Sequence, residues 1–212
     1  IAYGDSEACL GSAGTEGFKV VTKLPAIPDC PDGAGEWVRQ QVQASLERLG
    51  MPTVYGLLLH QSQQLTDPLG KLIVSVLEQM KAEGIVQKIG VSIYSPAELE
   101  LATRACKIDL VQAPFSLIDR RLHASGWLQR LHDAGVEIHA RSVFLQGLLL
   151  MPRSAIPEQF FRWNEIWDVW HRWLTDMGRV SAAQACIGFV QSFREVSRVV
   201  VGVDCVRQLE QL

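Results

Sequence analysis

Short apolar runs alternate along the chain with longer segments whose apolar residues recur every three or four positions. In segment 36–49 these are Trp37, Val38, Val42, Leu46 and Leu49, the period of an amphipathic helix. The pattern predicts strands at 18–23, 54–59, 87–91, 109–112, 136–140 and 198–201. It predicts helices at 36–49, 72–82, 96–106, 127–133, 157–177 and 181–193, and a last one from about 206.

The alternation of strand and helix favours an α/β fold with a parallel sheet, because parallel strands need a crossover between them. The strands are apolar almost throughout, as expected when helices cover a parallel sheet. Two architectures compete, a doubly wound open sheet and a (β/α)₈ barrel. No G-x-G-x-x-G follows the first strand, which weakens the dinucleotide-binding open sheet. No linker divides the chain, so residues 1–212 are expected to form one domain.

Each predicted strand leads into a polar residue or a glycine. In a (β/α) barrel, functional side chains lie at the carboxyl ends of the strands and in the loops that follow. The repetition over six strands therefore indicates a site at one end of the sheet. The residues are Lys23, His60, Ser92, Gln112, Arg141 with Ser142, and Gly202.

Composition narrows the class of protein further. The 212 residues carry a formal charge of −3 and are 48% hydrophobic, without the basic runs of nucleic-acid binding or the apolar length of a membrane span. Five scattered cysteines without a C-x-x-C pair fit a reduced, cytoplasmic protein. The histidines show no metal-ligand spacing, so we expect no metal site. The oligomeric state is not predicted.

Six segments, in order, resemble motifs of the aldo/keto reductase family. Tyr3-Gly4-Asp5-Ser6-Glu7 with Leu10-Gly11 is similar to the second half of the family's D-T-A-x-x-Y-G-x-S-E-x-x-L-G. The others are 20–23, ending in Lys; 57–60, ending in His; 88–94, similar to K-x-x-G-V-S-N-F; 111–116, with its Gln; and 200–210. The resemblance runs the length of the chain. It implies a (β/α)₈ TIM barrel of the aldo/keto reductase type, with the first one or two βα units absent from this chain.

The resemblance implies NAD(P)H-dependent reduction of an aldehyde or ketone, with Tyr3, Lys23 and His60 as catalytic residues. A Tyr hydroxyl, with a reference pKa of about 10, is a poor acid at neutral pH. A nearby Lys ammonium lowers that pKa, and an imidazole can hydrogen-bond the substrate oxygen. The family's Asp that pairs with the Lys would lie before Ile1. From a barrel length of about 250 residues, roughly 40–50 further residues are expected upstream.

The resemblance also implies a cofactor site. Ser92 and Gln112 would hold the nicotinamide amide, although Ile93 replaces the family's usual Asn. Arg141 stands where many members stack an aromatic on the ring, and a planar guanidinium can also stack. The pyrophosphate loop would contain Ser142, Leu145 and Gly147. The adenine end would be held by Gly202, Asp204, Gln208 and Gln211.

NADP(H), the family default, is the expected cofactor, and NAD(H) is the alternative. Asp204 favours NAD(H), because an acidic side chain prefers a free ribose hydroxyl to a phosphate, and only Arg207 is basic in this segment. The expected partner is a small carbonyl compound. A second hypothesis is a catalytically impaired, nicotinamide-binding barrel that acts as a regulatory or interaction subunit. A row of tryptophans is read as packing rather than as a substrate wall: Trp163, Trp167, Trp170 and Trp173.

Overall fold

The computed structural model describes residues 4–28, 33–66, 68–210 and 212. Six parallel strands form one sheet in which each strand pairs with the next along the chain. This arrangement confirms the parallel α/β class. The strand order of the sheet is consecutive, as in a barrel. The strands are β1 (Val21–Leu24), β2 (Val54–Leu59), β3 (Val86–Ser92), β4 (Leu110–Pro114), β5 (Glu137–Arg141) and β6 (Arg198–Val199).

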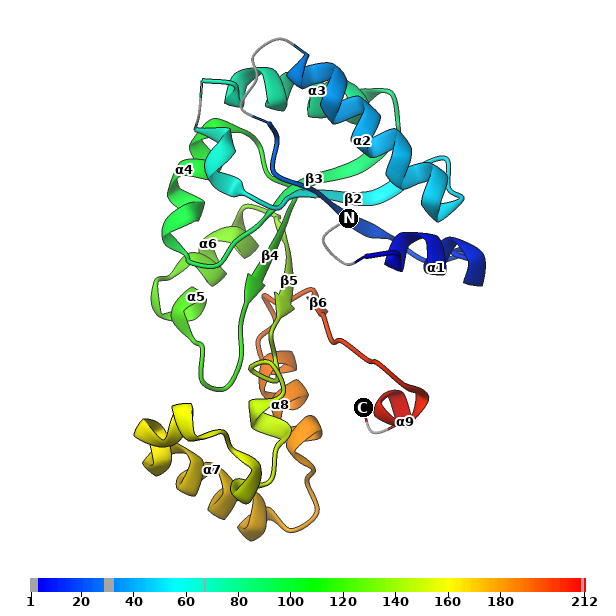
Figure 1. Cartoon of the computed structure of the whole chain (residues 1–212). Coiled ribbons are helices and arrows are strands. Elements are labelled where there is room, and N and C mark those ends of the chain that lie inside the picture. The colour runs from blue at the N-terminus through cyan, green and yellow to red at the C-terminus, as the bar shows by residue number, and fades with distance from the viewer. Residues whose placement is uncertain (1–3, 29–32, 67, 211) are drawn as a thin grey trace.

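Helices α2 and α3 cover the upper part of the sheet, α4, α5 and α6 lie along one side of it, and α7 and α8 lie at its lower end (Figure 1). The α-helices are α1 (Ser6–Ala13), α2 (Ala34–Leu49), α3 (Gly70–Ala82), α4 (Ala97–Ala105), α5 (Arg121–Ala124), α6 (Trp127–Asp133), α7 (Asn164–Met177), α8 (Ala182–Gln191) and α9 (Val206–Glu210). Short 3₁₀ turns are η1 (Ser62–Leu65), η2 (Leu148–Leu150), η3 (Arg153–Ala155) and η4 (Glu158–Trp163). None of the helices described is long and apolar enough to cross a membrane.

The apolar periodicity explains how α2 packs. Val38, Val42, Leu46 and Leu49 are at most 6% exposed, and they pack in the core with outward-facing strand residues. The helix ends at Gly50, whose φ of 65° is a left-handed conformation that glycine adopts without a Cβ clash. The helix and strand of each βα unit therefore share one apolar layer.

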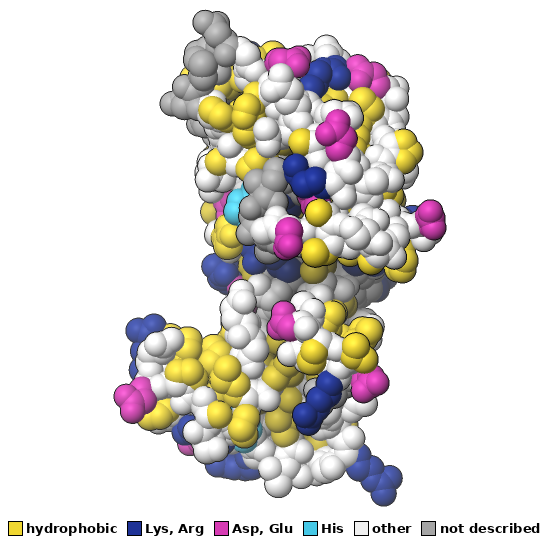
Figure 2. Space-filling view, turned by 45° about the vertical axis from the view of Figure 1, so that its right-hand side comes forward, with side chains coloured by type: hydrophobic (Ala, Val, Ile, Leu, Met, Phe, Trp, Pro, Cys, Tyr) yellow, Lys and Arg dark blue, Asp and Glu magenta, His cyan; other side chains and the backbone are white. Residues whose placement is uncertain are grey.

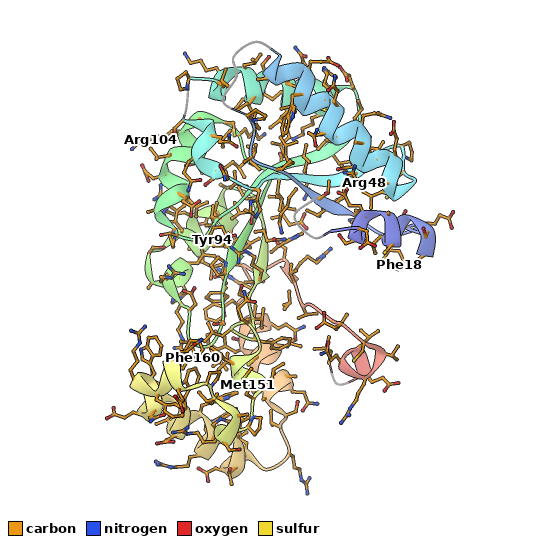
Figure 3. The ribbon with its side chains drawn as sticks, in the orientation of Figure 1. Phe18, Arg48, Tyr94, Arg104, Met151 and Phe160 are labelled. Carbon is orange, nitrogen blue, oxygen red and sulfur yellow. The ribbon has the colours of Figure 1, made fainter. Side chains whose placement is uncertain are left out.

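The two edge strands of the sheet are shorter than predicted. The first was expected from residue 18, but Phe18 is 73% exposed and its N–H donates to the Thr15 carbonyl, so residues 15–18 form a turn (Figure 3). Pairing in the sheet begins at Val21. The last strand was expected to reach residue 201, but β6 ends at Val199, the last residue that pairs with β5, its neighbour in the sheet.

Two helical regions differ most from expectation, apart from the short helix α5, which was not predicted. Segment 157–177 was predicted as one helix, yet a 3₁₀ turn, η4, precedes α7, because Trp163 leaves helical geometry at φ −112° and ψ 26°. Helix α1 was missed because it lacks an apolar stripe: Leu10 is 51% exposed and Glu7 is buried. Helix α8 begins after an N-cap at Ser181, whose hydroxyl accepts the Gln184 N–H at 3.1 Å in a capping box.

The tryptophan row is divided between core and surface. Trp167 and Trp170 are 3% and 8% exposed, and their indole N–H groups donate to the carbonyls of Phe160 and Leu149. Trp163 and Trp173 are 37% and 42% exposed. The packing role is thus confirmed for the two central residues. Hydrophobic side chains also gather on the surface of the lower part of the molecule, where α7 and α8 lie (Figure 2).

Candidate functional site

A cavity of about 650 Å³ lies at the carboxyl ends of the strands. It brings together residues that are far apart in the sequence, from β1, β4, the segment after β5 and the segment after β6. Eight residues predicted for the site line it: Lys23, Gln112, Arg141, Ser142, Gly147, Gly202, Asp204 and Gln208. Its other walls include Val143, Phe144, Gln146, Leu150, Ala183, Val200, Val201, Val203 and Leu212.

The cavity depends on the curvature of the sheet. Lys23 belongs to β1 and Gly202 follows β6, the two edge strands of the sheet, yet both line the same cavity. A flat sheet would hold its edge strands about 24 Å apart, at about 4.8 Å per strand. The sheet therefore curls toward the barrel geometry that the strand order predicts.

Lys23 and His60 come from neighbouring strands. Lys23 is the third residue of β1 rather than its end, which is Leu24. His60 follows β2 directly, and its backbone N–H donates to the Leu24 carbonyl at 3.2 Å. Lys23 lines the cavity, whereas His60 is not among the lining residues. Tyr3, predicted as the acid, lies outside the described residues.

Ser92 and Gln112 are register partners on β3 and β4. They are 3% and 6% exposed, which is unusual for polar residues without a structural or functional partner. Gln112 lines the cavity and Ser92 does not. Ile93, in place of the family's Asn, has a fully buried side chain, and its N–H donates to the Gln112 carbonyl at 3.0 Å. Its side chain therefore belongs to the core.

Arg141, the last residue of β5, is held in place on several sides. One guanidinium nitrogen donates to the Ile93 carbonyl at 2.8 Å, and another donates to Ser142 Oγ at 3.2 Å. Its Cζ lies 4.6 Å from the centre of the Tyr94 ring, within the range of a cation–π interaction. The planar group is thus fixed in orientation on the cavity wall.

The loop after β5 has an unusual backbone. In the described part of the chain, three residues other than glycine have positive φ, and all three lie here: Ser142 at 57°, Leu145 at 50° and Gln146 at 57°. Gly147 follows at 87°. Such conformations cost roughly 1–3 kcal/mol each and concentrate at ligand sites, where they can turn successive N–H groups toward an anion. Ser142, Gln146 and Gly147 line the cavity, whereas Leu145 does not.

The segment after β6 forms the opposite wall. Gly202 lies three residues beyond the strand, and the Asp204 N–H donates to Gln208 Oε1 at 2.6 Å at the start of α9. Asp204 places a carboxylate on a cavity that also carries Lys23 and Arg141. Gln211, predicted for the same wall, lies outside the described residues. No group of three or more His, Cys, Asp or Glu among the residues described could hold a metal ion.

Two residues near the site were not predicted from the sequence. Tyr94 contacts both His60 and Arg141, and Gln146 lines the cavity in a left-handed conformation. Tyr94 occupies the aromatic position of the K-x-x-G-V-S-N-F-like segment, which was a usable signal. A left-handed glutamine has no signature in a single sequence.

A parallel α/β sheet with a polar cavity at its carboxyl edge defines a class of ligand-binding and catalytic proteins. Comparison with known families assigns the chain within that class. The model of the Aldo/keto reductase family matches residues 2–212. The chain belongs to the aldo/keto reductase family.

Individual relatives are more distant. The chain is 28% identical over 136 residues to the NADH-specific methylglyoxal reductase of Escherichia coli (strain K12), covering 62% of this chain and 41% of that protein. It is 28% identical over 154 residues to aldo-keto reductase str7 of Strobilurus tenacellus, covering 69% and 45%. The chain thus spans less than half the length of these curated relatives.

Solved structures share the fold. The holo form of aldo-keto reductase AKR11C1 from Bacillus halodurans has a TM-score of 0.78 and 18% identity, covering 97% of this chain and 70% of that one. The thermostable aldo-keto reductase Tm1743, in complex with the inhibitor epalrestat, has a TM-score of 0.71 and 20% identity, covering 98% and 70%. The barrel-type fold predicted from the sequence is in agreement with these neighbours.

Proposed function

We propose that the cavity binds a nicotinamide cofactor and that the protein reduces an aldehyde or ketone to an alcohol. One observation carries the proposal: Lys23, Gln112, Arg141 and the left-handed loop 142–147 meet at one cavity in a chain of the aldo/keto reductase family. The cavity extends from the predicted catalytic Lys to Asp204, beyond β6. Its volume and its anion-suited loop fit a dinucleotide.

A reduced nicotinamide held in this cavity would supply the hydride that the carbonyl carbon receives. Tyr3 donates the proton to the oxygen, and the Lys23 ammonium favours the tyrosinate that results. His60 hydrogen-bonds the substrate oxygen and places it. Gln112 holds the carboxamide of the cofactor, and Arg141 presents its flat guanidinium to the ring. The left-handed loop directs N–H groups at the pyrophosphate.

Asp204 sets the cofactor preference in this proposal. Its carboxylate would repel the 2′-phosphate of NADPH and accept a hydrogen bond from the free ribose hydroxyl of NADH. The relative from Escherichia coli is named as NADH-specific. We therefore expect NADH to be used at least as well as NADPH, although NADP(H) is the family default.

The test is NAD(P)H oxidation by the purified protein with a panel of aldehydes and ketones that includes methylglyoxal. Wild type is expected to turn over at least one carbonyl. Tyr3→Phe and Lys23→Met are expected to lower kcat by at least about 100-fold, the usual contribution of general acid catalysis. Saturable cofactor binding without turnover of any carbonyl would refute the reductase and support the regulatory, nicotinamide-binding alternative.

A further inference from the structure

Tyr94 connects two strand ends that do not neighbour each other in the sheet. Its ring lies 6.5 Å from the His60 imidazole, centre to centre, with an interplanar angle of 87°. The same ring lies 4.6 Å from Arg141 Cζ. His60 follows β2 and Arg141 ends β5, with β3 and β4 between them. The Tyr94 side chain is 57% exposed, so the fold does not need it to fill the core (Figure 3).

The backbone of Tyr94 is fixed by one carboxylate. Glu98 Oε1 accepts the N–H groups of Tyr94 and Ser95, each at 2.8 Å. The other oxygen of Glu98 accepts the hydroxyl of Ser62, which lies two residues after His60. The loops after β2 and β3 are therefore joined by Glu98, and the ring of Tyr94 starts from a defined position.

The Tyr94 ring makes a different kind of contact with each of its two partners. The imidazole meets the aromatic ring in an edge-to-face arrangement, a preferred geometry for aromatic pairs. The guanidinium lies in reach of the same π-system, which attracts a cation. Its hydrogen bonds to the Ile93 carbonyl and to Ser142 Oγ restrain it in other directions. The ring thus adds a contact on Arg141 to these hydrogen bonds and lies edge-to-face with the imidazole of His60.

We propose that Tyr94 is a positioning residue of the site, whose ring holds both the His60 imidazole and the Arg141 guanidinium in their working orientations. The inference rests on the proposed function, in which His60 places the substrate oxygen and Arg141 faces the cofactor. Loss of the ring then acts on kcat through His60 and on cofactor affinity through Arg141. The phenolic hydroxyl has no part in either contact, so phenylalanine suffices at this position.

Three variants of the full chain test the proposal: Tyr94→Ala, Tyr94→Phe and, as a control, Phe18→Ala, an exposed aromatic of the turn before β1. The measurements are NADH affinity by fluorescence titration, kcat and KM for the best carbonyl substrate, and the NMR shift of the His60 imidazole. Tyr94→Ala should weaken NADH binding by about two- to fivefold, the range for an exposed cation–π pair. It should also lower kcat and remove the ring-current shift of His60.

Tyr94→Phe should match wild type within about twofold in affinity and kcat, and it should keep the His60 shift. Phe18→Ala should change none of the three measurements. If the wild-type protein is an active enzyme, the proposal is overturned when Tyr94→Ala changes the three measurements no more than Phe18→Ala does. It is also overturned when Tyr94→Phe is as impaired as Tyr94→Ala. If wild type consumes no carbonyl, the proposed function fails, whereas NADH affinity and the His60 shift still decide whether Tyr94 positions both groups.

Discussion

The Tyr55 hydroxyl donates a 2.6 Å hydrogen bond to Glu137 Oε2, although 82 residues separate the two in the sequence. Tyr55 lies near the start of β2 and Glu137 begins β5, so the pair lies at the end of the sheet away from the candidate site. The same carboxylate accepts a hydrogen bond from Lys88 Nζ and contacts His139 Nε2 at 2.8 Å. One carboxylate therefore joins β2, β3 and β5.

This cluster predicts a pH dependence of stability. Burial raises the pKa of Glu137, but hydrogen bonds from Lys88, Tyr55 and His139 outweigh burial and lower it to about 2. The unfolded carboxyl titrates at 4.5, so between pH 4.5 and 2 the unfolded chain binds more protons and stability falls as pH falls. Chemical denaturation across this interval should show that the free energy of unfolding falls by an amount on the order of 2–3 kcal/mol.

Glu137→Gln removes the titrating group and is the matched variant. The free energy of unfolding of this variant should be about 2 kcal/mol lower at neutral pH, because Lys88 no longer donates a hydrogen bond to a charged carboxylate. Its stability should vary less than that of wild type between pH 4.5 and 2. An unchanged pH slope in the variant would show that other carboxyls dominate the acid response.

Gly90 in β3 is required by the close approach of strands. A Cβ added there would lie 1.9 Å from the Leu110 carbonyl oxygen, which is a backbone atom that cannot move away. Gly90→Ala should therefore cost at least about 3 kcal/mol in urea denaturation. The control is Gly188→Ala in α8, where a Cβ meets nothing within 4 Å, and it should stabilise by up to about 1 kcal/mol. Equal effects of the two changes would contradict the β3–β4 packing.

The stability cost of replacing a tryptophan of α7 should follow the burial of its side chain. Trp170 is 8% exposed and donates to the Leu149 carbonyl at 3.1 Å, so Trp170→Ala should cost about 3–5 kcal/mol. Trp173 stacks on it at 5.6 Å but is 42% exposed, so Trp173→Ala should cost only about 1 kcal/mol. Urea midpoints at constant m-value measure both. A larger loss for Trp173 would mean that this face of α7 is covered in solution.

Asp204 offers a test of cofactor preference. Replacing its carboxylate with Asp204→Ser should raise the NADPH-to-NADH ratio of kcat/KM by at least about fivefold, the effect of removing one repulsive charge near a phosphate in water. Asp133→Ser, at an exposed position of α6, should leave the ratio unchanged. A ratio that does not respond to Asp204→Ser would place the adenosine away from this wall.

Strand order and most strand ends could be predicted because buried parallel strands are continuous apolar runs that stop where polar residues begin. The site residues on β4 and β5 followed from that rule. The residues that surround these site residues and hold them in place could not be predicted. Tyr94 reaches Arg141 only because β3 and β5 curve toward each other, and a left-handed Gln146 depends on the loop as a whole. Helix α1 has no apolar period, since its contacts are polar, as in the Glu7–Arg48 ion pair.

NADH titration of wild type, Arg141→Glu and Arg104→Glu shows whether the cavity around Arg141 holds a nicotinamide dinucleotide. Arg104 is an exposed arginine of α4 that does not line the cavity (Figure 3). We predict saturable one-to-one binding by wild type and Arg104→Glu, and at least about tenfold weaker binding by Arg141→Glu, since a second carboxylate would face the cofactor. Absence of saturable binding by wild type, or equal affinity in both variants, would contradict nicotinamide binding at this cavity.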